Sequence, residues 1–267
     1  MDVNTRSNSR FLIDLRSVLW SVMLLAVPLQ SALAWESESE VTPKLAEGWN
    51  VLLKIENRSP KPTPLPEDSL LRPVQDLKLR GPHVGHPFLL GDFETNGSWH
   101  IVDRELLRTG GENALLELPE VENFEVEGSF ASERLGGMLF LLGWTPDHSG
   151  YVLYNPTMKT KASGSPWHLC RFEKGQLVEG EDREVARYEW DGVKSIKWSI
   201  NQAQLSLTIG TKRLLKELPL PNYQPGKVMF GTYNTRYGPK LLRVRSLRIR
   251  EIPPPATTSS PPAESPR

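Results

Sequence analysis

The stretch Gly137-Met-Leu-Phe-Leu-Leu-Gly-Trp144 decides the fold class, because it is apolar on both faces when it is laid out as a strand. A strand of this kind fits the centre of a two-layer sandwich, where both of its faces are covered. The turn residues Thr145-Pro-Asp-His-Ser-Gly150 follow, and Tyr151-Val-Leu-Tyr154 then predicts the strand that pairs with it. The fold is therefore built outward from a central hairpin.

The segments on either side of this hairpin carry the period-2 pattern of half-buried strands. Phe124, Val126, Gly128 and Phe130 alternate with polar residues, which places one face in the core and the other in water. Apolar positions in 193–200 and 205–209 predict a hairpin over Asn201-Gln202. Because no long stretch has helical periodicity with caps, the region 88–252 predicts an all-β, two-sheet antiparallel sandwich.

The first 34 residues have the features of a secretory signal peptide. Three arginines precede the uncharged stretch 17–29, and Ala32-Leu33-Ala34 supplies the small-x-small cleavage pattern. The apolar run is shorter than the roughly 20 residues of a spanning helix, although an uncleaved N-terminal anchor is the alternative. We expect cleavage after Ala34, export to the periplasm or the medium, and no transmembrane segment in the mature chain.

The flanks of the sandwich differ from it in composition. Residues 35–87 predict a leader with one strand at Trp49–Ile55, followed by the proline-rich segment 59–66, which is typical of a polyproline spacer or a long crossing loop. Residues 253–267 are rich in Pro, Ser and Thr and predict a disordered tail.

Charge and cysteine content exclude several classes of partner. Residues 1–34 hold three of the 32 basic and two of the 32 acidic residues, which leaves 29 and 30 in the mature chain. This balance argues against nucleic acid and against electrostatic capture by an anionic membrane. Cys170 is the single cysteine, so the chain has no intrachain disulfide or thiolate metal site. We expect no cofactor.

A family resemblance rests on the order of glycines and apolar positions. Gly91-Asp-Phe93, Ser98-Trp99-His-Ile-Val102, the central hairpin and the closing segments 228–235 and 242–249 resemble concanavalin A-like jelly-roll domains. The pattern is most similar to laminin-G-like domains and to the bacterial 3-keto-disaccharide hydrolase domain. The resemblance covers residues 88–252 and implies a jelly-roll sandwich, while the activities of such domains vary widely.

The carboxylates that catalysis would need are not evident in the sequence. Glycosidases of this fold carry acids at alternating positions on one strand, close enough to flank a glycosidic bond. Glu125 and Glu127 have this spacing, but their alternation with apolar residues is typical of a solvated strand face. The hydrolase-like group also has an Asn-Ser-Gly element in the central strand, where this chain has Leu135-Gly-Gly-Met138. We therefore predict no catalytic residues.

Two aromatic-rich loops are the candidate carbohydrate site. Sugar sites combine aromatic faces with a few polar groups for the hydroxyls. The turn 145–150 and the Gly-, Ser- and Lys-rich segment 159–168 could form one rim at an end of the sandwich, although the same aromatics could be ordinary core residues. The candidate residues are Trp144, Asp147, His148, Tyr151, Tyr154, Trp167 and His168.

Two further motifs have simpler interpretations. His83-x-x-His86 supplies only two imidazoles, too few for a zinc site, so we expect no metal there. The arginines at 243, 245, 248 and 250, with Lys240, suggest either a site for an anionic partner or a charged edge strand that resists aggregation. The near-zero net charge favours the edge strand.

These observations favour an exported carbohydrate-binding or surface-interaction module, whose partner is a glycan or another envelope protein. A glycoside hydrolase-type enzyme and a purely structural envelope module are the alternatives. Two convergent acids about 5–10 Å apart would indicate the enzyme. Exposed Trp144 or Trp167 rings would indicate binding, and a rim whose aromatics are all buried would indicate the structural module.

Overall fold

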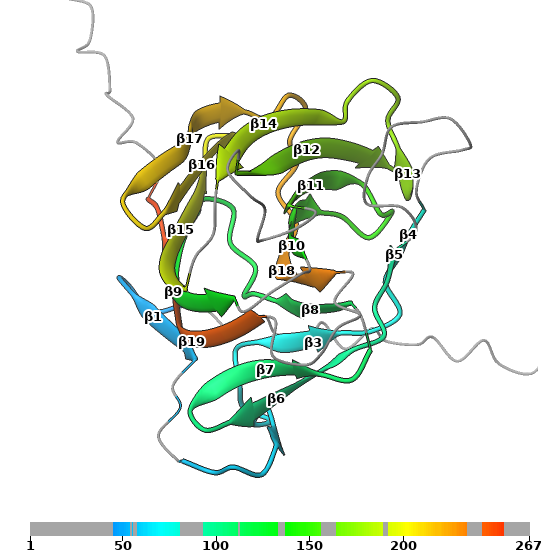
Figure 1. Ribbon diagram of the computed structural model, residues 1–267. Helices are drawn as coiled ribbons and strands as arrows, with labels where there is room; N and C mark the ends of the chain where they lie inside the picture. Colours follow the sequence, from blue (N-terminus) through cyan, green and yellow to red (C-terminus); the bar gives the residue numbers. More distant parts are fainter. Residues whose placement is uncertain are drawn as a thin grey trace, which may run out of the picture. The chain divides into compact units, whose positions relative to one another are not determined.

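Two large antiparallel sheets form the part of the chain that the structure describes (Figure 1). The computed structural model describes residues 45–53, 55, 58–80, 93–111, 113–132, 137–155, 164–188, 192–233 and 242–253. Within them no helix occurs, and hence none that could cross a bilayer. The predicted all-β, two-sheet antiparallel sandwich is confirmed.

Sheet A is the larger of the two sheets. Its described strands, in pairing order, are β17 (Lys212–Pro219), β16 (Gln204–Ile209), β15 (Val193–Asn201), β9 (Phe124–Ser132), β19 (Leu242–Glu251), β7 (Glu105–Thr109), β6 (Ser98–Val102) and β2 (Thr63–Pro64), and β1 (Asn50–Leu53) also pairs with β19. The hairpin predicted over residues 193–209 is β15–β16, with its turn at Gln202 and Ala203.

Sheet B contains the central hairpin. Its described strands, in pairing order, are β13 (Gln176–Leu177), β12 (Ser165–Glu173), β11 (Gly150–Asn155), β10 (Gly137–Trp144), β18 (Lys227–Tyr233), β8 (Ala114–Glu117) and β3 (Arg72–Val74), and β14 (Arg183–Tyr188) also pairs with β12. β10 lies between β11 and β18, as its two apolar faces predict. A short pair, β4 (Lys78–Leu79) with β5 (Phe93–Glu94), forms a third sheet.

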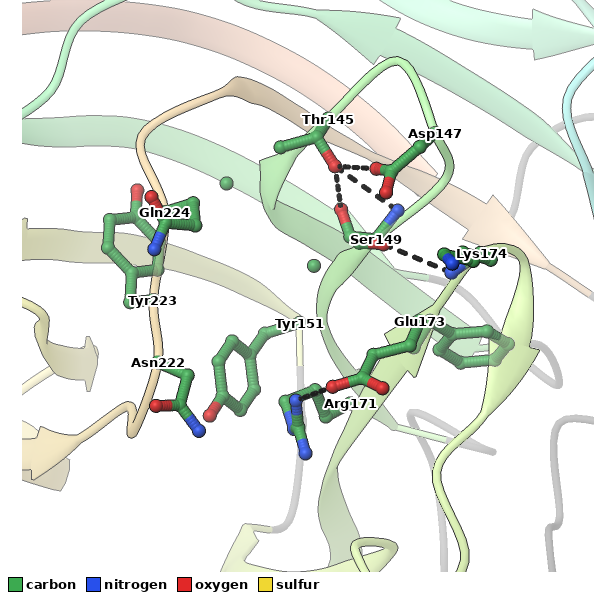
Figure 2. Close-up of a pocket in the computed structure, with 13 residues that line it drawn as sticks. Thr145, Asp147, Ser149, Tyr151, Arg171, Glu173, Lys174, Asn222, Tyr223 and Gln224 are labelled. Atoms are coloured by element: carbon green, nitrogen blue, oxygen red, sulfur yellow. Dashed lines mark hydrogen bonds and ion pairs between the residues drawn. The ribbon is translucent and has the colours of Figure 1, made fainter.

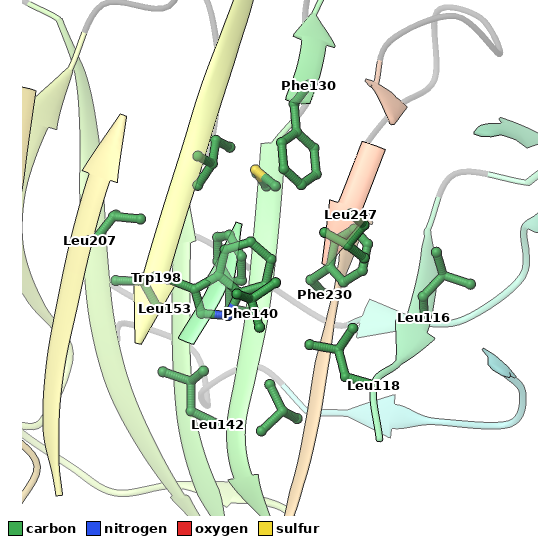
Figure 3. Close-up of a cluster of buried hydrophobic side chains, with 14 of the residues drawn as sticks. Leu116, Leu118, Phe130, Phe140, Leu142, Leu153, Trp198, Leu207, Phe230 and Leu247 are labelled. Carbon is green, nitrogen blue, oxygen red and sulfur yellow. The ribbon is translucent and has the colours of Figure 1, made fainter. Parts of the chain in front are cut away.

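The main core lies between the two sheets and is rich in aromatic rings (Figure 3). The Trp198 ring of β15 lies 5.0 Å from Phe140 and 5.9 Å from Phe230, measured between centroids, and these rings come from sheet B. Phe130 meets Phe230 edge-on at 6.0 Å. Tilted and edge-on pairs of this kind add to the stabilisation that burial provides.

A second core covers the opposite, outer face of sheet B. Leu139 and Leu141 of β10 and Cys170 of β12 are fully buried there, and they form a cluster with Leu79 and Phe93 of the small third sheet. The outer face of sheet B is thus covered by apolar side chains rather than exposed to water. This explains why β10 is apolar at every position between its two glycines.

The N-terminal strands belong to the sandwich. β1 pairs with β19, β2 with β6, and β3 with β8, so described parts of the segment 35–87 contribute to both sheets. The sandwich therefore begins well before residue 88, where the sequence placed its start. Pro64 and Pro73 lie in the outermost strands β2 and β3, where a missing backbone donor is tolerated. The signal segment 1–34 and the tail from residue 254 lie outside the described residues.

The arginine-rich strand β19 is central, which corrects the prediction of an edge strand. It lies between β9 and β7, and its arginines pair with carboxylates on those two neighbours. Glu105 binds Arg243 at 3.1 Å and Arg245 at 2.6 Å, and Glu127 binds Arg248 at 2.8 Å. The arginines therefore neutralise acidic residues on the outer face of sheet A, and they do not guard an edge. Lys240 lies outside the described residues.

Candidate functional site

A cavity of about 340 Å³ opens at one end of the sandwich, where three segments meet (Figure 2). The first is the turn between β10 and β11, the second is the end of β12 with its following turn, and the third joins β17 to β18. Asn222, Tyr223 and Gln224 lie on one side of the cavity in Figure 2, and Asp147 and Glu173 lie on the other. Its lining residues are Gly143, Thr145, Asp147, Ser149, Gly150, Tyr151, Arg171, Phe172, Glu173, Lys174, Asn222, Tyr223 and Gln224.

The turn between β10 and β11 is held by hydrogen bonds around Thr145. Its hydroxyl lies 2.5 Å from Asp147 Oδ1 and accepts the N–H of Ser149 at 3.2 Å. The hydrogen bond from Thr145 holds the pKa of Asp147 below its ordinary value, so this exposed carboxylate stays ionised at neutral pH. The Ser149 hydroxyl accepts the N–H of Lys174 at 3.0 Å, which joins this turn to the second segment.

Arg171 carries the most constrained charge of the cavity. Its guanidinium binds both carboxylate oxygens of Glu181, at 2.8 and 2.9 Å, and it also contacts Glu173. The hydrogen bonds to Glu181 raise the pKa of Arg171 and lower that of Glu181, so both groups stay charged. A fork-to-fork pair of this kind fixes the plane of the guanidinium.

The third segment is packed closely against the first. Gly143 has φ +61°, and a Cβ at that position would lie 2.3 Å from the carbonyl oxygen of Gln224 and 2.6 Å from the Tyr223 ring. Only glycine fits such an approach without a shift of the neighbours. The Tyr151 hydroxyl donates to the carbonyl of Pro221 at 2.5 Å, which ties sheet B to the same segment.

Burial raises the pKa of Tyr223 to about 12. Its buried hydroxyl has no hydrogen-bond partner among the described residues, even though the ring lines the cavity. A buried polar atom without a partner is uncommon in a folded protein. The Tyr223 hydroxyl is therefore an unsatisfied polar atom on a residue of the cavity lining.

The structure brings two of the predicted site residues into this cavity, namely Asp147 and Tyr151. His148 belongs to the same turn, but its ring lies beside Trp144 at 6.4 Å between centroids and outside the cavity lining. Trp144 and Trp167 are 3% and 2% exposed, so neither ring offers the free face that a stacking role requires. Trp144 packs on Phe172 in the outer core, and Trp167 packs on Phe140 in the main core.

Tyr154 and His168 lie elsewhere, on the outer face of sheet B. They face each other across β11 and β12, with their rings stacked at 5.2 Å. The Tyr154 hydroxyl lies 3.3 Å from a carboxylate oxygen of Asp182, and His168 Nδ1 lies 3.4 Å from the other. Trp167 and His168 thus belong to strand β12, which corrects the loop predicted for residues 159–168. Of that loop, residues 159–163 lie outside the described residues.

Most residues of the cavity are not evident from the sequence. Arg171, Asn222, Tyr223 and Gln224 come from segments about 50 residues apart, and they form no motif that spacing would reveal. The turn-forming run Leu220-Pro-Asn-Tyr-Gln-Pro225 was the available signal, because it indicates a loop that ends a strand. It indicates neither which end of the sandwich the loop reaches nor what it meets there.

Metal ligands do not gather in the part of the chain that the structure describes. There, no three His, Cys, Asp or Glu side chains are grouped in a way that could hold an ion. His83 and His86 lie outside the described residues. Cys170 is fully buried, and burial raises its pKa well above the ordinary value, so its thiol stays protonated.

Comparison with known proteins finds likeness in solved structures alone. No protein-family model matches the chain, and no curated protein does. The narrower resemblance to 3-keto-disaccharide hydrolase domains therefore has no support from a family model.

Similar solved structures include the carbohydrate-binding module CBM66 from Bacillus subtilis, with 11% identity over 58% of this chain and 89% of that one, at a TM-score of 0.40. The GH43 protein BlXynB from Bacillus licheniformis is 9% identical over 58% of this chain, which spans only 35% of its length, at a TM-score of 0.42. A tetrameric galectin from the ball sponge Cinachyrella is 10% identical over 50% of this chain and 95% of that one, at a TM-score of 0.38. Likeness at this level indicates neither a family nor a shared ligand, and the sandwich architecture rests on the two sheets described above.

Proposed function

We propose that this protein is an exported carbohydrate-binding module and that it binds a neutral saccharide in the cavity at the end of the sandwich. The observation that carries the proposal is the lining of that cavity, in which donors, acceptors and the half-buried Tyr223 ring converge. Small-molecule sites usually have volumes of about 300–1,000 Å³, and this cavity lies within that range.

The charges of the cavity favour a neutral ligand. Asp147 and Glu173 are acidic, Arg171 and Lys174 are basic, and their formal charges cancel. Arg171 is moreover already paired with Glu181, so little uncompensated positive charge remains for an anionic ligand. A neutral ligand with many hydrogen-bonding groups therefore suits the site better than a phosphate or a carboxylate.

The polar groups suit hydroxyls in particular. A hydroxyl donates one hydrogen bond and accepts up to two, so it needs acceptors and donors close together. The carboxylates of Asp147 and Glu173 accept, the ammonium of Lys174 donates, and the amides of Asn222 and Gln224 do both. The half-buried Tyr223 ring adds apolar surface against which the C–H face of a sugar ring can pack.

A glycan array probed with the chain from Trp35 onward tests the proposal, followed by calorimetry on the best binder. The informative variant combines Asn222→Gly with Gln224→Ala. Asn222 has φ +60°, so glycine keeps the backbone relaxed while the amide is removed. The matched control is Gln202→Gly, an exposed amide at φ +50° that lies outside the cavity.

We expect the double variant to weaken binding at least tenfold, which corresponds to about 1.4 kcal/mol, and the control to bind as the unchanged protein does. An array with no binder would contradict the function. Binding that survives the double variant would contradict the site while leaving the function in place.

Export is part of the proposal and is supported by the sequence of residues 6–34. Expression of the full chain in a bacterial host should yield a periplasmic or secreted form whose N-terminal residue is Trp35. Mass spectrometry of the intact product measures this directly, and Ala34→Asp, which removes a small residue from the cleavage pattern, should block processing. If the unchanged chain, like the Ala34→Asp variant, gave a full-length cytoplasmic product, export would be contradicted.

A further inference from the structure

The solvent face of sheet A carries a second hollow, a groove of about 440 Å³ that is larger than the end cavity. It runs over β9, β15, β16 and β17, whose inner faces belong to the main core. The residues that line it are Glu125, Lys197, Ser199, Asn201, Gln204, Ser206, Thr208, Arg213, Glu217 and Ile252. A polar outer face is ordinary for an antiparallel sheet, but a hollow in it needs a cause.

The hollow follows from the sizes of the side chains. Ser199 and Ser206 face each other across β15 and β16, and these short residues form the floor. Longer side chains rise around them, with Lys197 and Glu125 joined by an ion pair of 2.7 Å on one side. The centre of the groove is thus low because its residues are small, and its rim is high because theirs are long.

Two irregularities in β17 build the opposite wall. The pairing of β16 with β17 shifts once between Leu205 and Leu207 and again between Leu207 and Thr208, and each shift places an additional residue in β17. Glu217 lies at the first of them with φ +50°, and its N–H donates to the Ser206 hydroxyl at 3.1 Å. Bulges of this kind re-aim side chains.

The bulges of β17 bring two side chains of opposite charge to the same wall of the groove. Residues four apart in a regular strand are about 13 Å apart along its axis. Arg213 and Glu217 nevertheless approach to 3.7 Å between Nη2 and Oε1. This wall is therefore a neutral ion pair, whereas on the opposite wall Glu125 pairs with both Lys197 and Arg250.

The groove repeats the chemistry of the end cavity. Its four charged residues cancel, and the floor between them presents hydroxyls and amides. The Ser206 hydroxyl accepts the Glu217 N–H and keeps its own hydrogen to donate. A neutral, hydroxyl-rich chain matches this surface, whereas a nucleic acid or an acidic polymer would meet cations that already pair with Glu125 or Glu217.

The groove and the cavity meet at the segment that leads from β17 to β18. Glu217 lines the groove, and Asn222, five residues further along, lines the cavity. Between them the N–H of Leu220 donates to the carbonyl of Ala203 at 2.9 Å. Ala203 is adjacent to Gln204, which lines the groove, so the same short segment borders both hollows.

We propose that the cavity and the groove are two parts of one extended site for a linear neutral polysaccharide. One portion of the chain occupies the cavity, and neighbouring units cross the β17–β18 segment and lie on the floor of the groove. The inference rests on the proposed function and deepens it, because it names a polymer rather than a single sugar as the ligand class.

Chain-length dependence tests the inference. The probes are glucose and xylose with their soluble β-linked oligomers of two to six units (cello-, laminari- and xylo-oligosaccharides), measured by calorimetry on the chain from Trp35 onward. The blocking variant is Ser199→Tyr, which fills the floor of the groove. Its matched control is Ser195→Tyr, on the same strand and the same face but outside the groove. Gln204→Ala is a second groove variant at an exposed position, where a folding defect is not expected, and thermal melting verifies the fold of each.

We expect affinity for at least one oligomer series to rise tenfold or more from the monomer to the hexamer, as added subsites contribute. Ser199→Tyr should abolish this gain, Gln204→Ala should reduce it about threefold or more, and Ser195→Tyr should leave it unchanged. Equal affinity for monomer and hexamer, or a gain that persists in both groove variants, would overturn the extended site while the end cavity stands. No binding of any probe, together with an empty glycan array, would overturn both proposals.

Discussion

The outer faces of the two sheets differ sharply in chemistry, although both sheets contribute their inner faces to the same core. On sheet A the outer residues are charged or hydroxylated and form ion pairs such as Arg250 with Glu125 at 2.7 Å. On sheet B they are mainly apolar side chains with almost no exposure, such as Leu139, Val152 and Phe172, and β4 and β5 pack against them. Sheet A thus has one apolar face, and sheet B has two.

The residue patterns of the strands account for this difference. β9, in sheet A, alternates between apolar and polar residues from Phe124 to Phe130, whereas β10, in sheet B, is apolar without interruption. A strand whose second face is also apolar must be covered by a further layer, since exposure of that face would cost about 25 cal/mol for each Å² of apolar surface. Sheet A can therefore offer a solvated, hollow surface to a ligand, whereas the outer face of sheet B is buried and stabilises the fold.

The largest predicted effect comes from the outer core of sheet B. Leu141→Ala should lower the free energy of unfolding by about 2–5 kcal/mol, because Leu141 is fully buried there. Thr208→Ala, on the outer face of sheet A, should change it by less than about 0.5 kcal/mol. Urea titration followed by tryptophan fluorescence measures both. A cost below about 1 kcal/mol for Leu141→Ala would mean that the layer over sheet B contributes little, against the comparison.

The next largest effect concerns Tyr223, which lines the cavity at the end of the sandwich. Its pKa is raised from 10.0 to about 12, so the unfolded chain ionises first as the pH rises. The stability that the protonated phenol contributes is complete below pH 10 and is lost between pH 10 and 12, with a loss of about 1 kcal/mol at pH 11.

The Tyr223→Phe variant isolates this contribution, since other groups titrate alike in both proteins. The difference in unfolding free energy between the two proteins should be constant up to pH 9 and should then move in favour of the variant. A difference that stays flat to pH 11 would show that the phenol is solvated.

A smaller effect on the free energy of unfolding distinguishes two glutamates on the outer face of sheet A. The Glu125 side chain is 11% exposed and pairs with Lys197 and Arg250, whereas that of Glu127 is 32% exposed and pairs with Arg248. Glu125→Gln should cost about 1 kcal/mol and Glu127→Gln less than about 0.5 kcal/mol, since solvent screens the more exposed pair. Chemical denaturation at low and high salt measures both. Equal losses of unfolding free energy in the two variants would contradict the predicted difference between the buried and the exposed pair.

The smallest perturbation is chemical labelling, which leaves the fold intact. Cys170, beneath the outer layer of sheet B, should resist iodoacetamide in the native protein and react in urea, because burial raises the pKa of its thiol. Ser199→Cys, on the face of sheet A, should add one site that reacts without denaturant. Mass spectrometry counts the modified sites, and native labelling of Cys170 would show that the layer over sheet B opens.

The central features of the fold could be predicted because they depend on local pattern. The two apolar faces of β10, the turn 145–150 and the hairpin of β15 and β16 follow from residues that are adjacent in the sequence. Strand β12 was not predicted, although Ser165, Trp167 and Leu169 are buried and alternate with half-buried residues. The Gly, Ser and Lys residues of the segment 159–168 led to the prediction of a loop there.

Long-range pairing explains what the sequence could not show. The arginines of β19 indicated an edge strand because their partners, such as Glu105 for Arg245, are 140 residues away. The candidate site was predicted around the turn 145–150, and the cavity indeed adjoins that turn. Its other walls, which include Arg171 and Asn222, come from segments whose approach depends on the register of both sheets. The tryptophans chosen as binding surfaces instead fill the two cores, as aromatic strand residues commonly do.

The position of β19 bears on how the chain folds in time. Its residues 242–251 bind β9 and β7 from the middle of the chain and β1 from near its start, so sheet A stays divided until the last strand arrives. Such contacts are distant in sequence, and domains that depend on them fold slowly, on a scale of roughly milliseconds to seconds. A growing chain therefore cannot close sheet A before β19 has left the ribosome. A polypeptide with this topology therefore remains threadable until β19 has been synthesised, a property that would suit the export proposed above.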